Sequence, residues 1–321
     1  MSRIVVIHEN EEWIVPLRRA LAERDVPLEE WYIDSWRVDL GAVPPEGVFY
    51  SRMSASSYMR DHRFSPDMAS ITLSWLERHG RRVINGAGVL ALEVSKMAQY
   101  AALDAHGILT PRTVAAMGAD SVVEAARAFA PAPVILKPNR GGKGDGVQLF
   151  LTVDALSEFI HGGDYEEPVD GIWVLQEYVK AAKPFITRCE FIGGKLFYAV
   201  RVDTSQGFDL CPADVCQIGD AFCPAGEDAP AKFTIVDTVD RGLIEKYETF
   251  LAANHIEVAG IEFIVDEAGQ VFTYDINTNT NYNSDAEARA GKSAMNQVAR
   301  FLETELARVA DPRQGELRLT G

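Results

Sequence analysis

Short apolar runs alternate with amphipathic stretches along the first third of the chain. The apolar runs lie at 4–7, 31–33, 48–50 and 83–84, and the stretches with helical spacing lie at 13–24 and about 67–79. Strands that alternate with helices in this way are typical of a small parallel sheet covered by helices. We therefore predict an N-terminal α/β domain at residues 1–95.

A second pattern follows, with more glycine and fewer long helical stretches. Helical spacing runs from about 89 to 106, Gly107 closes that helix, and Pro111 begins a new segment. The rest of this part alternates in the order helix, strand, glycine-rich loop, strand, helix, strand, at 121–129, 134–137, 138–146, 147–151, 154–160 and 173–179. We predict a compact α+β lobe at residues 96–179.

The last part of the chain contains two hairpin signals. One pair of strands flanks Gly193 and Gly194, and the other flanks a predicted four-residue loop at 267–270. An irregular stretch with cysteine and proline at 204–230 and helices near 236–253 and 285–309 complete a predicted lobe at residues 180–321. The pattern of the whole chain thus predicts an α/β domain followed by two α+β lobes.

Composition narrows the class of protein. The 321 residues are 47% hydrophobic, and 47 acidic against 31 basic residues give a formal net charge of −16, which disfavours a nucleic-acid partner. No apolar run is long enough to cross a bilayer, so we expect no membrane partner and a cytoplasmic location. The four cysteines form no CxxC pair, and we expect reduced thiols. A homodimer is the expectation for a soluble enzyme.

Serine and arginine are concentrated at 51–66, directly after the predicted strand at 48–50. Open α/β sheets bind ligands at the carboxyl ends of their strands, which makes this segment a candidate substrate loop. A solvated loop is the alternative, and the sequence does not decide between them.

Lys137 ends a buried strand just before a loop that contains Gly141, Gly142, Gly144 and Gly146. Glycine lets backbone N–H groups approach phosphate oxygens, and a lysine adds a point charge. The loop matches neither the P-loop nor the Rossmann pattern, because no Ser or Thr follows its lysine and it leads into a strand. It is either a loop that covers phosphate groups or a glycine turn without a ligand.

A strand about 35 residues later ends in the segment Gln176, Glu177, Tyr178 and Val179. The backbone edge of such a strand can pair with an adenine ring that flanking aliphatic side chains enclose. Taken alone, a strand end that turns into solvent explains the segment equally well.

The first hairpin carries two arginines, Arg188 and Arg201. A two-residue Gly-Gly turn would pair Arg188 with Ala199 and place Arg201 on the same face as Arg188. Glu190 on that face offsets only part of their charge, so we predict a phosphate or a substrate carboxylate between them. A purely structural pairing is the alternative.

The second hairpin places Glu262 opposite Asp275, with Asn277 two residues further along the same strand and on the same face. Two carboxylates and an amide oxygen in one place suit a hard cation such as Mg²⁺ that bridges nucleotide phosphates. The alternative is that the asparagines at 277, 279, 281 and 283 form a polar turn.

The order of these motifs resembles the ATP-grasp superfamily, and within it the RimK-like and glutathione-synthetase-like ligases. The resemblance covers residues from about 85 to 300 and implies an ATP-grasp fold behind a pre-ATP-grasp domain. It implies ATP-binding roles for Lys96, Lys137, the glycine loop and residues 176–179, and roles for Arg188 and Arg201 at the phosphates and the acyl-phosphate. It implies Mg²⁺ at Glu262, Asp275 and Asn277, with Mn²⁺ as the alternative ion.

Three positions depart from the pattern of that family. In that family the first metal-binding carboxylate is usually the shorter and the second the longer, whereas here the longer Glu262 comes first and the shorter Asp275 second. The combined length of the two side chains across the hairpin is therefore unchanged. Ile186 stands where RimK-like chains commonly carry an aspartate, which leaves Glu177 or Glu190 as candidates for ribose recognition. Thr280 replaces a common proline after the Asn-rich turn.

The resemblance implies an ATP-dependent ligase that joins a small-molecule carboxylate to an amine through an acyl-phosphate. Asp275→Asn is expected to retain the fold and lose turnover, because one of the two carboxylates that hold the cation is removed. A phosphotransferase of the same fold and a nucleotide-binding protein without turnover remain the alternatives. The sequence does not name either substrate, and the resemblance alone implies an amino acid or small peptide.

Overall fold

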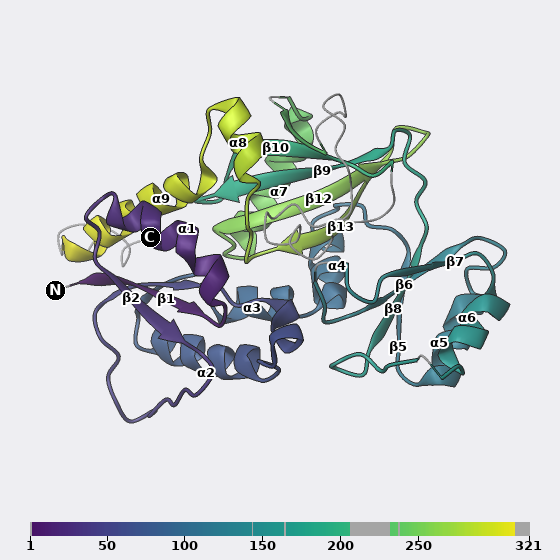
Figure 1. Ribbon diagram of the computed structural model, residues 1–321, viewed down its shortest axis with the longest axis horizontal. Helices are drawn as coiled ribbons and strands as arrows, with labels where there is room; N and C mark the ends of the chain where they lie inside the picture. Colours follow the sequence, from purple (N-terminus) through teal and green to yellow (C-terminus); the bar gives the residue numbers. More distant parts are fainter. Residues whose placement is uncertain (1, 143, 164, 206–231, 237, 312–321) are drawn as a thin grey trace.

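The computed structural model describes residues 2–142, 144–163, 165–205, 232–236 and 238–311. Within these residues the chain forms three β-sheets, and each predicted segment of the chain contains one of them (Figure 1). Most of the stretch at 204–230, with Cys211, Cys216 and Cys223, lies outside the described residues, whereas Cys189 is a buried free thiol.

The N-terminal sheet is parallel, with strand order β2-β1-β3-β4, as the alternating pattern predicts. Its strands are β1 (Arg3–His8), β2 (Leu28–Tyr32), β3 (Gly47–Ser51) and β4 (Arg82–Ile84). Alternate residues of β1 face opposite sides of the sheet, so Val5 and Ile7 pack under α2 (Ser65–Arg78) and α3 (Ala87–Glu93), and Ile4 and Val6 pack under α1 (Glu11–Ala22).

Local capping explains where α1 begins. The side chain of Asn10 accepts hydrogen bonds from the backbone N–H groups of Glu12 and Trp13, and the first turn contains Glu11 and Glu12, which favour the positive end of the helix dipole. Ile14, Leu17 and Leu21 are buried at helical spacing. The helix therefore starts two residues before the predicted one.

The single helix predicted at 89–106 is wrong, because the chain forms two helices there. α3 ends at Glu93, and Ser95, in extended conformation, caps α4 (Lys96–Asp104) by accepting from the backbone N–H of Ala98. Because of this break, Lys96 is the first residue of a new helix. Gly107, with φ of 63°, ends this region as predicted.

The small lobe is an antiparallel sheet with strand order β5-β8-β6-β7, covered on one face by two helices. Its elements are β5 (Thr113–Ala116), α5 (Ala119–Arg127), β6 (Val134–Pro138), β7 (Gln148–Phe150), α6 (Val153–Ile160) and β8 (Trp173–Glu177). The sequence pattern missed β5, a four-residue edge strand in which no side chain is buried.

The C-terminal sheet is antiparallel, with strand order β11-β10-β9-β12-β13. Its strands are β9 (Phe185–Ile192), β10 (Lys195–Asp203), β11 (Phe233–Val236), β12 (Val258–Val265) and β13 (Val271–Asn277). One face packs on α4 and on α7 (Arg241–Ala253), and the other packs on α9 (Ala294–Ala310), which follows the short α8 (Ser284–Ala290).

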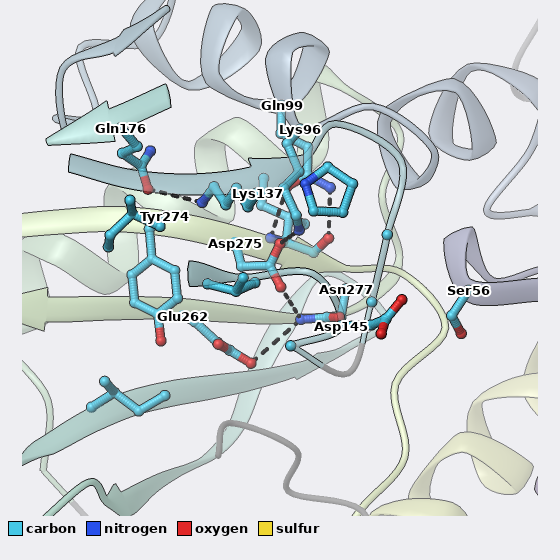
Figure 2. Close-up of a pocket in the computed structure, with 18 of the residues that line it drawn as sticks. Ser56, Lys96, Gln99, Lys137, Asp145, Gln176, Glu262, Tyr274, Asp275 and Asn277 are labelled. Carbon is cyan, nitrogen blue, oxygen red and sulfur yellow. Dashed lines mark hydrogen bonds and ion pairs between the residues drawn. The ribbon is translucent and has the colours of Figure 1, made fainter. Parts of the chain in front are cut away.

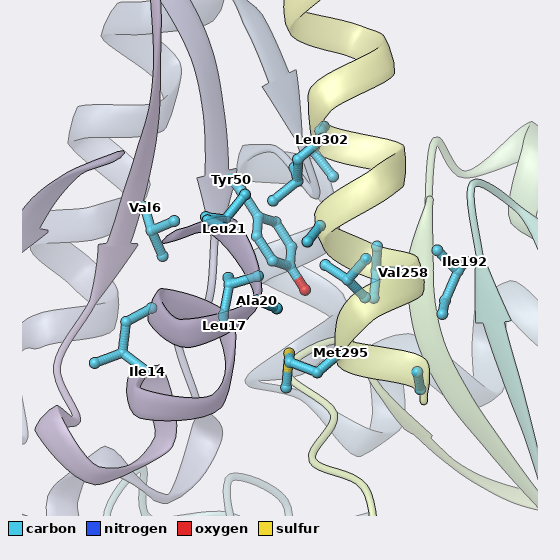
Figure 3. Packing of buried hydrophobic residues seen from close by; sticks show 14 of the residues in the cluster. Val6, Ile14, Leu17, Ala20, Leu21, Tyr50, Ile192, Val258, Met295 and Leu302 are labelled. Atoms are coloured by element: carbon cyan, nitrogen blue, oxygen red, sulfur yellow. The ribbon is translucent and has the colours of Figure 1, made fainter. Parts of the chain in front are cut away.

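Helix α9 joins the N-terminal and C-terminal sheets through one core. Val298 and Leu302 of α9 lie in the same buried cluster as Tyr50 of β3 and Val258 of β12. Figure 3 shows Leu302, Tyr50 and Val258 gathered around the helix. At the edge of this core, Arg82 of β4 forms ion pairs with Glu257 and Glu305. No helix among the described residues is long and apolar enough to span a membrane.

Candidate active site

One cleft lies where the small lobe, the C-terminal sheet and the N-terminal domain meet. It is lined by every predicted site residue except Arg201, namely Lys96, Lys137, Gly141, Gly142, Gly144, Gln176, Glu177, Tyr178, Val179, Arg188, Glu262, Asp275 and Asn277. Figure 2 shows Gln176 at one end of this cleft and Ser56 of the N-terminal domain at the other. The fold thus brings together motifs that are far apart in the sequence.

The predicted metal ligands lie side by side on β12 and β13. Glu262 pairs with Asp275 as predicted, and the Asn277 side chain lies between the two carboxylates, with Nδ2 3.1 Å from Asp275 Oδ2 and 3.4 Å from Glu262 Oε1. Rotation of the Asn277 amide by half a turn would present its oxygen to the same point. Two carboxylates and an amide in this arrangement fit a Mg²⁺ ion.

The pairing of Glu262 with Asp275 depends on an irregularity that the sequence does not show. The strands end at Val265 and Val271, so the connecting loop has five residues, 266–270, and the predicted four-residue loop is wrong. A bulge at Tyr274 then shifts the register by one residue and restores the predicted pair.

The two lysines of the cleft lie in different electrostatic surroundings. Lys96 Nζ lies 2.7 Å from Asp275 Oδ1, whereas Lys137 Nζ donates to the neutral oxygens of Tyr100 and Gln176 at 2.6 and 2.8 Å. Burial and the nearby charge of Lys96 lower the pKa of Lys137 to about 7. Burial also disfavours the charge of Lys96, but Asp275, together with Tyr100 and Glu262, outweighs this effect and raises the pKa of Lys96.

The two predicted metal-binding carboxylates also have different pKa shifts. Burial raises the pKa of Glu262 to about 7, although Arg188 opposes the shift. Asp275 is partly exposed; burial acts to raise its pKa too, but the charge of Lys96 beside it lowers the pKa. Asp275 is therefore the carboxylate that stays ionised most readily near neutral pH.

Arg188 lies at the centre of a buried hydrogen-bond network. Its guanidinium donates to Glu190 at 2.6 Å, to Glu262 at 3.0 Å and to Thr280 Oγ1 at 2.5 Å, and the Thr280 hydroxyl donates to Glu190 at 2.9 Å. Gly260 of β12 leaves room for this arrangement, because a Cβ at that position would lie 2.5 Å from Arg188 Nε. Arg188 is thus fixed beside Glu262.

Arg201 does not lie in this cleft, and the register predicted for its hairpin is wrong. A bulge at Phe197 in β10 pairs Arg188 with Val200 and Arg201 with Thr187, so Arg201 faces the opposite side of the sheet. There its guanidinium packs over the Phe185 ring, 4.6 Å from the centroid, and lines a separate cavity. The predicted convergence of two arginines therefore does not occur.

The end of the cleft near Gln176 is apolar, but β8 is an inner strand there, and the backbone N–H groups of Glu177 and Tyr178 donate to Arg112 O and Pro133 O. Ile135, Tyr178 and Val179 line it from the small lobe, and Ile186 and Ile264 line it from the C-terminal sheet. Glu177, one candidate for ribose recognition, lines the cleft and accepts from the backbone N–H of Arg112 at 2.7 Å. Glu190, the other candidate, is occupied by Arg188 and Thr280.

The glycine loop lies against the N-terminal domain. The Tyr58 hydroxyl, in the 3₁₀ helix η1 (Ala55–Arg60), donates to Asp145 Oδ2 at 3.0 Å, and a Cβ on Gly142 would lie 3.3 Å from Ser56 Cβ. Gly144 has a φ of 74°, a conformation that favours glycine. The glycines therefore permit both the turn and the close approach.

The segment at 51–66 is partly a wall of the cleft, so the solvated-loop interpretation is wrong for its first half. Residues 51–57 are buried, and Ser54 and Ser56 line the cleft opposite the metal-binding hairpin. In open α/β sheets, loops at the carboxyl ends of the strands line the ligand site. The position of this segment directly after a predicted strand was therefore the signal in the sequence.

Sequence reasoning missed two further residues that line the cleft, the buried Gln99 and the partly exposed Glu93. Gln99 lies one helical turn after Lys96 and exchanges hydrogen bonds with the backbone of Ile276, and Glu93 accepts from the backbone N–H and the hydroxyl of Thr278. Both fix the strand end that carries Asp275 and Asn277. The spacing of Gln99 from Lys96 was the available signal, whereas Glu93 had none.

A further group with metal-ligand chemistry lies in the N-terminal domain, but it already contains a cation. Ligand atoms of His8, Glu11 and Glu30 lie within 4.8 Å of one another. Arg18 forms ion pairs with both carboxylates, at 2.7 Å to Glu30 and 3.1 Å to Glu11. Arg18 therefore offsets one of the two negative charges of this cluster.

Comparison with solved structures shows the class of fold. The ATP-grasp ligase PsnB, in complex with a minimal precursor, is similar with a TM-score of 0.66 and 15% identity, covering 94% of this chain and 99% of that one. A RimK domain ATP-grasp protein from Sphaerobacter thermophilus DSM 20745 is similar with a TM-score of 0.63 and 17% identity, covering 94% and 99%. The chain has the ATP-grasp fold, as its motifs predict.

Curated sequences point to the same group of ligases. The alpha-aminoadipate–LysW ligase LysX of Sulfurisphaera tokodaii is 29% identical over 113 residues, which are 35% of this chain and 39% of that protein. The chain spans about two fifths of the length of the curated relatives it matches. No protein-family model matches the chain. These likenesses confirm the resemblance to RimK-like ATP-grasp ligases.

Proposed function

We propose that this protein is an ATP-dependent carboxylate–amine ligase that forms an amide or peptide bond and releases ADP and phosphate. The observation that carries the proposal is the convergence of Glu262, Asp275 and Asn277 with Lys96 and Lys137 in one cleft. Lysines and metal-binding carboxylates together neutralise the charge of a phosphoryl group during transfer. The names of the similar proteins, which are ligases, support the same reaction class.

ATP would lie along the cleft with its adenine at residues 176–179 and its phosphates between the glycine loop and the two lysines. A structure of PsnB holds Mg and ADP, which supports the same nucleotide chemistry here. Glu262, Asp275 and Asn277 would hold Mg²⁺, which neutralises phosphate charge when it is bound. To bind phosphate oxygens, Lys96 would give up its contact with Asp275, and Lys137 would give up its contacts with the oxygens of Tyr100 and Gln176.

The reaction would proceed in two displacements. A substrate carboxylate oxygen attacks the γ-phosphorus of ATP, the bond to the β-phosphate oxygen breaks, and ADP leaves. The amine then attacks the acyl carbon, loses a proton, and phosphate leaves. Arg188, fixed beside Glu262, offsets the negative charge in both steps, and the glycine loop excludes water that would hydrolyse the acyl-phosphate.

The test is ADP release from Mg-ATP with pooled amino acids, dipeptides and small carboxylic acids. We expect release that requires both a carboxylate and an amine, and a loss of about 10²-fold or more in Asp275→Asn because one metal-binding carboxylate is removed. Circular dichroism should show that the variant is folded.

Each other outcome has a defined meaning. Release with a single substrate and no amine would indicate a phosphotransferase. Nucleotide binding without release in any pool would favour a non-catalytic role, and wild-type turnover by Asp275→Asn would contradict the assignment of the metal ligands.

A further inference from the structure

A buried arginine beside the cleft has no anionic partner. Arg52, directly after β3, is 3% exposed, and among the residues that the structure describes no carboxylate lies within ion-pair distance of it. Its guanidinium donates only to neutral acceptors, Asn279 Oδ1 at 3.0 Å, Thr280 O at 3.1 Å, Asn281 Oδ1 at 2.8 Å and Met295 Sδ at 3.7 Å. A buried charge without a counter-charge is unfavourable.

The hydrogen bonds of Arg52 fix the orientation of two asparagine amides. Both Asn279 and Asn281 line the cleft, and both direct their Oδ1 atoms to the guanidinium. Because a guanidinium can only donate, it selects the amide oxygen, and the Nδ2 group of each amide remains for the cleft. Within the described part of the chain, neither Nδ2 atom has a protein partner.

A pair of serines on the opposite wall provides one more donor. Ser54 Oγ and Ser56 Oγ lie 2.9 Å apart, and both residues line the cleft. Ser54 Oγ also accepts from the backbone N–H of Ser56, and Ser56 Oγ accepts from Arg60. The pair has two hydroxyl protons and uses one between its own oxygens, so one O–H remains to donate to a ligand, whichever serine provides it.

The other charges at this end of the cleft already have partners. Arg60 forms a two-pronged ion pair with the buried Glu9, and burial raises the pKa of Glu93, whose oxygens accept from Thr278 and from the backbone N–H of Ala55. Arg52 therefore places a positive charge without a counter-charge next to the asparagine amides, and these amides and the serine pair still have N–H and O–H groups without an acceptor.

We propose that Asn279, Asn281 and the Ser54–Ser56 pair bind a carboxylate of the substrate, with Arg52 as the positioning residue that orients both amides and provides the buried positive charge. Two amide N–H₂ groups and a hydroxyl match the lone pairs of a carboxylate, and the ligand provides the anion that the protein lacks. This inference rests on the proposed function and deepens it: one substrate carries a free carboxylate that binds at this end of the cleft.

The variant Asn281→Asp tests this inference without breaking the contact to Arg52. An aspartate keeps the acceptor for the guanidinium, removes one donor from the cleft, and places inside the protein the anion that the ligand is proposed to provide. The variant should therefore fold at least as stably as the wild type and bind carboxylates poorly. Asn296→Asp is the matched control. Asn296 is exposed in the first turn of α9, and its substitution by aspartate makes the same change in charge as Asn281→Asp.

The measurement is ¹⁹F NMR titration of N-trifluoroacetylglycine, with N-trifluoroacetylglycinamide as its neutral analogue, in saturating Mg-ADP so that the nucleotide anion sites are filled. We expect the acid to bind the wild type and Asn296→Asp with equal affinity, and Asn281→Asp about tenfold or more weakly. The amide should bind weakly to all three proteins.

Three results would overturn the inference. These are equal binding of the acid to Asn281→Asp and the wild type, equal binding of acid and amide to the wild type, or no binding of the acid to a protein that binds Mg-ADP. A protein that does not bind Mg-ADP at all would instead contradict the proposed function, so the two failures are distinguishable.

Discussion

Lys96 and Lys137 show how two residues of one type differ in charge within one cleft. Lys137 is buried and Lys96 is partly exposed. Lys96 contacts the ionised Asp275, whereas Lys137 contacts only the neutral Tyr100 and Gln176 and lies near the charge of Lys96. The pKa of Lys96 is raised and that of Lys137 falls to about 7. The cleft thus avoids holding two full positive charges before a phosphate arrives.

This difference predicts that nucleotide binding takes up a proton. Above pH 7 Lys137 is mainly neutral, and a bound phosphate raises its pKa, so binding should take up close to one proton near pH 8 and affinity should fall as the pH rises from 7 to 9. Calorimetry in buffers of different ionisation enthalpy measures the proton count. Of the charged and titratable groups that face Lys137, namely Lys96, Tyr100, Glu262 and Asp275, Lys96 stays protonated throughout this range, whereas Glu262, with a pKa of about 7, is already mainly ionised at pH 8.

The control for this prediction is Lys137→Met, which should lose most of the proton uptake, against Lys195→Met at an exposed position, which should keep it. Equal uptake by the wild type and Lys137→Met would show that another group is responsible.

Strands β9 and β12 form one functional element, because Gly260 of β12 provides the space for Arg188 of β9. Gly260→Ala should displace the guanidinium from Glu190 and Glu262, since its Cβ would lie 2.5 Å from Arg188 Nε. We expect a loss of about 1–3 kcal/mol in the free energy of unfolding, together with a fall in ADP release. Urea denaturation measures the first effect.

Gly88→Ala is the matched control for Gly260→Ala. Gly88 lies in α3, its φ is not positive, and a Cβ there meets no atom within 4 Å. This change should leave stability unchanged or raise it slightly. A Gly260→Ala protein as stable and as active as Gly88→Ala would contradict the packing argument.

At the scale of elements, the sequence predicted most strands and helices and many of the residues that line the cleft, but it failed where the backbone departs from regular geometry. A bulge at Phe197 turned Arg201 to the other face of its sheet, and a serine cap split the helix predicted at 89–106. Periodicity and turn length cannot reveal a bulge, because one extra residue alters the register without changing the hydrophobic pattern much. The bulge at Tyr274 left the predicted Glu262–Asp275 pair intact only because it compensated for a longer loop.

The partners within the cleft depended on the whole molecule and could not be predicted from local sequence. Arg52 and Asn279 are 227 positions apart, and Lys96 and Asp275 are 179 apart. The first contact exists because the N-terminal and C-terminal sheets share the core around α9 (Figure 3), and the second exists because α4 packs on the C-terminal sheet. Sequence motifs identified which residues carry chemistry, and tertiary packing determined which of them meet.

The shared core predicts that these two parts of the molecule lose stability together. Leu302 of α9 is fully buried between them, so Leu302→Ala should cost about 2–5 kcal/mol in the free energy of unfolding. Hydrogen exchange should accelerate in both β1 and β9, with little change in β6 of the small lobe. Leu151→Ala, at a position 67% exposed, should cost no more than about 0.5 kcal/mol. Faster exchange confined to one of the two sheets would contradict a common core.

The central claim is that the protein activates a carboxylate by phosphorylation before an amine attacks. The most direct measurement uses ¹⁸O-labelled carboxylate with the amine, Mg-ATP and wild-type protein, followed by mass spectrometry of the released phosphate. We predict one ¹⁸O atom in the phosphate for each amide formed, because the carboxylate oxygen that attacks the γ-phosphorus leaves with it. Amide formation with unlabelled phosphate would contradict the acyl-phosphate route.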